Sequence, residues 1–238
     1  FLSSQNDETF FYEIRSRIRR SVAEIKEKQQ FYLRKLEKQN AMAEHGNQLS
    51  ATFGQDLWNL IHDDENESDK FPETGFILEI LRFLQLLCEG HNLQLQNYLR
   101  SQTQNVKSYD LISETASYLE ALYREIDPTN IDIAIQVFTT LTEYCQGPCT
   151  ENQYALIRTK LCESTNQILQ QTEFNFPEEK AMELKECTIV ALLSLLEGIT
   201  TSSIPRQMIA TLDFSVMKDN MDDFFDENHP PDPDSEDI

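Results

Sequence analysis

Two glutamates stand at the ends of strongly apolar helical stretches, where a carboxylate is mildly destabilising. Glu89 closes a run that stops at Gly90, and Glu143 lies near the end of a run that stops at Gly147. The carboxyl end of a helix carries a partial negative charge and leaves backbone carbonyls without partners. Gln146 follows Glu143 by three residues, so both side chains share one helix face.

These residue types indicate binding of a hard cation. Carboxylates, an amide oxygen and backbone carbonyls are the ligands that calcium prefers in proteins. Glu89, Glu143 and Gln146 are thus a candidate, partial calcium site. On the residues alone we favour the alternative, that both glutamates are solvated side chains with no common role, because the sequence does not show that the two helix ends meet.

Other familiar chemistry is missing from the sequence. The motifs of nucleotide-binding loops, hydrolase nucleophiles and zinc proteases are absent, and the four histidines are scattered. The acidic stretch 63–69 fails as an EF-hand in both registers tested. Cys145, Cys149 and His91 have a spacing unlike that of zinc sites, so buried thiols are the better interpretation. We expect a protein that is not an enzyme.

The elements that hold these residues are predicted to be helices, because apolar residues recur at helical spacing and glycine and proline are few. The most apolar stretch, 76–92, is predicted to be buried nearly all round. Other helices are expected at 7–43, 50–62, 91–104, 109–126, 131–146, 150–172, from 177 through 198, and as one or two between 204 and 225. Predicted core residues are Leu84, Leu87, Phe138, Leu141 and Leu193.

Helices in succession with short turns predict an all-α fold, an armadillo- or HEAT-like stack of antiparallel helices. We divide the chain into a long basic helix, a short helix with an acidic loop, the main helical domain, and a weak helix with an acidic tail that is disordered from Asp226. These segments are 1–49, 50–75, 76–214 and 215–238. No repeat of fixed period is visible in the letters.

The net charge of −21 is concentrated in the acidic loop and tail. Such a balance disfavours nucleic acid and anionic membranes as partners. The basic surface of the helix 7–43 either contacts an anion or is a solvated face with Glu–Lys pairs, and we favour the second interpretation. No apolar run is long enough to span a bilayer. Because the chain begins at Phe1, we expect a piece of a longer protein.

Three segments resemble the intracellular calcium-release channels, the inositol-trisphosphate receptors and ryanodine receptors. They are LRFLQLLCEGHN at 81–92, QNYLR at 96–100 and LTEYCQGPCTENQ at 141–153. Weaker matches at 192–198 and 206–208 extend the resemblance over roughly 76–208. The resembling region is the one called RIH-associated, a helical segment upstream of the membrane pore.

The resemblance implies a tetrameric channel in the endoplasmic or sarcoplasmic reticulum membrane, with this segment soluble on the cytosolic face. Its partners would be other domains of the channel and its tetramer neighbours. Glu89 and Glu143 match the activating calcium site of that family, Gln146 lies close by, and a further ligand comes from a domain absent here. The expected function is to couple cytosolic calcium to pore opening. The alternative is a helical-repeat scaffold that senses no ion.

Two departures from the family limit what the resemblance assigns. The connection between Glu125 and Ile131 is shorter than in the family members. The motif at 81–92 is similar to ryanodine receptors, whereas the motif at 141–153 is similar to inositol-trisphosphate receptors. The resemblance therefore assigns neither the branch of the family nor the activating ligand.

Overall fold

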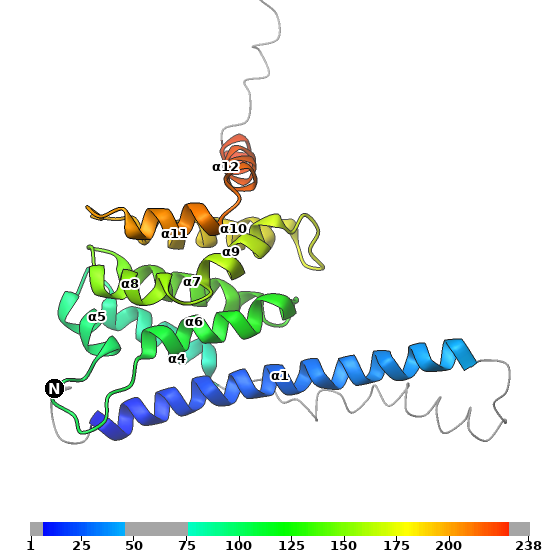
Figure 1. Ribbon diagram of the computed structural model, residues 1–238, viewed down its shortest axis with the longest axis horizontal. Coiled ribbons are helices and arrows are strands. Elements are labelled where there is room, and N and C mark those ends of the chain that lie inside the picture. The colour runs from blue at the N-terminus through cyan, green and yellow to red at the C-terminus, as the bar shows by residue number, and fades with distance from the viewer. Residues whose placement is uncertain (1–6, 46–75, 229–238) are drawn as a thin grey trace, which may run out of the picture.

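The computed structural model describes residues 7–45 and 76–228, and these residues form helices without any strand (Figure 1). The prediction of an all-α chain is confirmed. The predicted helix 50–62 and the acidic stretch 63–69 lie outside the described residues. The helices are α1 (Asp7–His45), α4 (Ile77–Cys88), α5 (Leu93–Arg100), α6 (Leu111–Leu122), η2 (Tyr123–Glu125), α7 (Ile131–Cys145), α8 (Thr150–Ile157), α9 (Leu161–Gln170), α10 (Glu178–Ser194), α11 (Ser203–Thr211) and α12 (Phe214–Asn228).

The nine helices from α4 to α12 form three units of three helices, stacked on one another. The first helices of the units, α4, α7 and α10, pack side by side. The second helices, α5, α8 and α11, do the same, and so do the third helices, α6, α9 and α12. Figure 1 shows the units as tiers above α1. Units of this kind are typical of armadillo-like stacks, so the predicted stack is confirmed.

The core lies between the helix layers. Most of the predicted core residues are confirmed. Leu84, Phe138 and Leu141 are buried, and Leu87 is half-buried against the core. The prediction for Leu193 was wrong, because this side chain is 52% exposed. Leu192 is buried instead, and one residue along a helix rotates a side chain by about 100°.

The prediction that the stretch 76–92 is buried nearly all round was also wrong. Its helix, α4, is the first helix of the first unit, and α7 covers one of its flanks. On the outer side Phe83 is 40% exposed and Leu86 is 47% exposed. The apolar surface of α4 therefore exceeds what the described core covers.

Several helix boundaries differ from the prediction; the expected helix 91–104, for example, is α5 and ends at Arg100. The expected helix 150–172 is two helices, α8 and α9. The Thr159 hydroxyl and the Thr159 amide both donate to the Leu156 carbonyl, at 2.6 and 2.9 Å, which closes a tight turn in place of a further helical turn. The predicted disorder from Asp226 begins too early, because α12 continues to Asn228. Residues 229–238 lie outside the described residues.

The long helix α1 attaches to the stack along α6. Phe11, Ile14 and Ile18 are buried in the common core. On the basic face, the Arg15 and Arg19 guanidinium groups both donate to a Glu114 carboxylate oxygen, at 2.8 and 2.9 Å. Two of the basic residues of this helix thus pair with a carboxylate of the chain itself, which favours the interpretation without an external anion.

Burial alone would raise the pKa of Glu114. The hydrogen bonds and charges of Arg19 and Arg15 outweigh burial, so the pKa of Glu114 is lowered from its ordinary value. Glu114 therefore stays ionised beside the two arginines at neutral pH, and the ion pairs help to hold α1 against the stack.

Candidate functional site

The three candidate ligands lie at the carboxyl ends of two neighbouring helices. Glu89 is exposed and directly follows the last residue of α4, and Glu143 is half-buried in the last turn of α7. Gln146 directly follows α7 and is half-buried. The turns after α4 and α7 are in contact, because a Cβ built on Gly147 would lie 2.4 Å from the His91 Cβ. The stack therefore places the two helix ends at one edge.

The two carboxylates influence each other electrostatically. Burial is the largest cause that raises the pKa of Glu143, and the negative charge of Glu89 raises it further. His91 acts in the opposite direction. A second carboxylate at the negative end of a helix is unfavourable unless a cation or a proton compensates it.

The carbonyls at the end of α7 are not free, contrary to the expectation from sequence. The Gln96 side-chain amide donates to the Glu143 carbonyl at 2.8 Å and to the Gln146 carbonyl at 2.7 Å. The Asn152 amide donates to the Tyr144 carbonyl at 2.9 Å. A cation at this edge would therefore contact the side chains of Glu143 and Gln146, since these backbone oxygens already accept hydrogen bonds.

The same clamp recurs one unit further along the stack. The Gln153 amide donates to the Ser194 carbonyl at 2.8 Å and to the Glu197 carbonyl at 2.9 Å, at the end of α10. Glu197 also accepts a hydrogen bond from the Gly147 amide at 3.1 Å. Gln96 and Gln153, which we call the amide ladder, thus link the helix ends of successive units.

Sequence reasoning missed the amide ladder, although a short signal for it exists. Gln96 stands six residues after Gly90, and Gln153 stands six residues after Gly147. Both glycines have a positive φ, at 72° and 97°, which glycine adopts without the steric cost that a side chain adds. A glycine turn followed by a buried glutamine therefore marks the same place in two units.

Comparison with known proteins identifies the region. Residues 72–169 match the family described as "RyR and IP3R Homology associated". The chain is 43% identical over 102 residues to the inositol 1,4,5-trisphosphate receptor itr-1 of Caenorhabditis elegans, covering 38% of this chain and 4% of the relative. Residues 72–169 therefore correspond to the RIH-associated region of the inositol-trisphosphate and ryanodine receptor family. All three candidate ligands lie within the matched residues.

A second relative extends the match beyond the RIH-associated region. The inositol 1,4,5-trisphosphate receptor-like protein A of Dictyostelium discoideum is 30% identical over 154 residues, which cover 62% of this chain and 5% of that protein. The chain thus spans about a twentieth of the length of these relatives. Among the described residues, no helix is both long enough and apolar enough to cross a membrane.

The cysteines of the RIH-associated region, Cys88, Cys145, Cys149 and Cys162, are all buried. Burial raises the pKa of Cys88 to about 12, and it also raises the pKa of Cys145 and Cys149. Within 7–45 and 76–228, no group of three or more His, Cys, Asp or Glu residues has the arrangement to hold a metal by itself.

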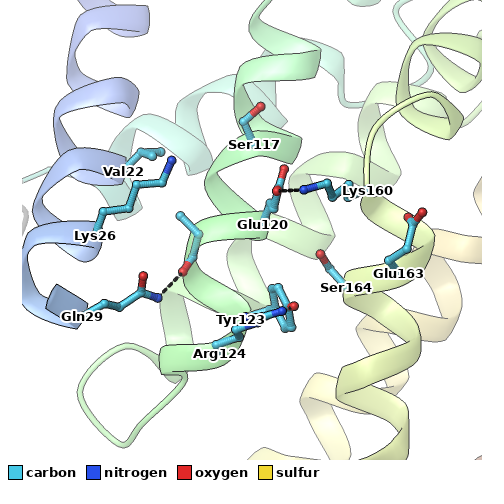
Figure 2. A pocket seen from close by; sticks show the side chains of 11 residues that line it. Val22, Lys26, Gln29, Ser117, Glu120, Tyr123, Arg124, Lys160, Glu163 and Ser164 are labelled. Carbon is cyan, nitrogen blue, oxygen red and sulfur yellow. Dashed lines mark hydrogen bonds and ion pairs between the residues drawn. The ribbon is translucent and has the colours of Figure 1, made fainter. Parts of the chain in front are cut away.

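A separate groove of about 510 Å³ lies between α1, α6 and α9 (Figure 2). Lys26, Arg124 and Lys160 bring positive charges to its lining, and Glu120 and Glu163 bring negative charges. The Lys160 ammonium pairs with the Glu120 carboxylate at 2.5 Å, and Figure 2 shows this contact at the rim. The lining thus carries charges of both signs, and the three candidate ligands lie elsewhere.

Proposed function

We propose that this chain is a cytosolic regulatory element of an intracellular calcium-release channel and that it responds to calcium. The named relatives are inositol-trisphosphate receptors, which supports the channel as the parent protein. The observation that carries the calcium role is the pairing of Glu89 and Glu143 at two adjacent helix ends, where the charge of Glu89 raises the pKa of Glu143.

The pairing suggests a mechanism of regulation. Calcium takes six to eight oxygen ligands, and this edge offers two carboxylates and the Gln146 amide oxygen. A neighbouring domain and water must supply the rest, so the isolated chain should bind calcium weakly or not at all. If the neighbouring domain adds its ligand in only one arrangement of the channel, calcium stabilises that arrangement and shifts the gate.

The wider setting is part of the same proposal. The parent would be a tetrameric channel of the endoplasmic reticulum, with this chain on the cytosolic face and other channel domains as partners. The second candidate function is a scaffold that binds a partner protein without sensing an ion. The exposed apolar side chains of Val190 and Leu193 on α10 favour that role for the flank of the stack at α10.

Changing Glu143 to Gln in the whole channel should shift activation to roughly tenfold higher calcium, within the usual range of coupling between sites. The substitution removes a ligand charge and keeps the shape of the side chain. Channel current recorded against cytosolic calcium measures the shift. Glu186→Gln, which neutralises an exposed carboxylate on α10, is the matched control and should leave activation unchanged. Unaltered activation in Glu143→Gln would favour the scaffold function.

Thermal melting of the 238-residue chain separates this effect from misfolding. Because the pKa of Glu143 is raised in the folded state, the folded chain loses stability as pH rises from the ordinary glutamate pKa through the raised value. Glu143→Gln should therefore melt at no lower a temperature than the wild type at pH 7. Any gain in melting temperature should vanish below the ordinary glutamate pKa, where Glu143 is protonated in both states.

A further inference from the structure

Successive units of the stack make the same type of contact at their turns, which we call the stacking rule. A Cβ built on Gly147 would lie 2.4 Å from the His91 Cβ, and one built on Gly198 would lie 2.4 Å from the Pro148 Cγ. In both cases the glycine of one unit packs against the residue that follows the glycine of the preceding unit. The preceding unit also supplies the amide-ladder glutamine that clamps two carbonyls.

At the end of α4, neither the glycine contact nor the amide clamp has a counterpart among the described residues. Among residues 7–45 and 76–228, and apart from the chain neighbours of Gly90, no heavy atom lies within 4 Å of a Cβ built on Gly90. The Leu86 and Glu89 carbonyls correspond to the clamped carbonyls of Glu143 and Gln146, at the same distances before the turn glycine. Within the described part of the chain, no side-chain amide donates to either of them.

The flank of α4 also differs from the equivalent flanks of α7 and α10. Seven residues before its turn glycine, α7 has Thr140, which is buried and donates to the Leu81 carbonyl of α4 at 3.1 Å. At the same position α10 has Ala191, which is buried as α10 packs on α7. The equivalent residue of α4 is Phe83, a large apolar side chain that stays 40% exposed.

The helix α1 occupies the place of a third helix in a preceding unit. It packs along α6 as α6 packs along α9, and it also touches α4 as α6 touches α7 (Figure 1). The Phe10 ring of α1 meets the Phe83 ring edge-on, with centroids 5.9 Å apart, and covers only part of it. In the other units a first and a second helix come before the third helix in sequence.

We propose that Phe83, Leu86 and Gly90, which we call the open rung, form an interaction surface for one further unit of this stack. Its occupant is a helix–turn–helix pair of the longer polypeptide, ahead of Phe1, with α1 as the third helix of the same unit. Its second helix carries a glutamine or asparagine whose amide donates to the Leu86 and Glu89 carbonyls. This inference is independent of calcium binding.

Cysteine labelling tests the open rung. Leu86→Cys and Leu193→Cys replace two leucines of similar exposure, 47% and 52%, near the ends of equivalent helices. Each variant is made in the 238-residue chain and in a protein extended at its N-terminus along the parent polypeptide. The rate of maleimide labelling is compared after subtraction of the wild-type background from Cys187 and the buried thiols.

Extension should slow labelling of Leu86→Cys at least tenfold and leave Leu193→Cys unchanged. Equal labelling of Leu86→Cys in both proteins would overturn the proposal. Protection of both cysteines would also overturn it, because a cover over the whole layer of first helices is not a further unit on α4. A structure of the extended protein should show an amide donor at the Leu86 and Glu89 carbonyls, and a non-helical cover there would contradict the inference.

Discussion

Leu84→Ala should lower the free energy of unfolding of the chain by about 2–5 kcal/mol. Leu84 is fully buried in the layer between α4 and α7, so truncation removes apolar contacts and leaves a cavity. Urea denaturation followed by the helical circular dichroism signal measures the change.

Leu193→Ala is the matched control for Leu84→Ala. Leu193 is on the equivalent helix α10 but is exposed, so its truncation should change stability by less than about 0.5 kcal/mol. Equal effects of the two substitutions would show that the layer of first helices is not packed as described here.

Gly147→Ala should destabilise the chain by about 2–5 kcal/mol, more than Gly90→Ala. Both glycines have a positive φ, which costs an L-residue about 1–2 kcal/mol. At Gly147 the added Cβ would also overlap the backbone-proximal atoms of His91, and overpacking costs a further 1–3 kcal/mol or so. At Gly90 no neighbour from the described part of the chain lies within 4 Å of the added Cβ, so only the backbone cost remains.

The difference between the two glycine variants measures the contact between successive turns. Chemical denaturation of both proteins under one set of conditions gives this difference directly. If Gly147→Ala and Gly90→Ala are equally destabilised, the turns do not pack against each other, and the stacking rule on which the open rung rests would be wrong.

The helices were largely predictable, because their apolar spacing is a local property of the sequence. The face that each helix buries was less predictable. In the run around Leu193 nearly every position is apolar, so the pattern does not say which side points inward, and the packing on α7 decides it. The break between α8 and α9 was missed because it depends on one hydroxyl contact, from Thr159 to the Leu156 carbonyl.

The candidate site shows a different limit. The residue types of Glu89 and Glu143 indicate cation chemistry, but their helix ends meet only through the stacking of two units. Whether they meet is a long-range property that local spacing does not contain. The amide clamp of Gln96 was missed for the same reason, and it changed which α7 oxygens are available to a cation.

The proposed calcium role is tested most directly by a structure of the proposed parent channel with calcium bound. We expect an ion between the Glu89 and Glu143 carboxylates, with oxygens at about 2.3–2.6 Å and at least one ligand from a neighbouring domain. Calcium bound only elsewhere, with the two carboxylates far apart on rigid helices, would contradict it.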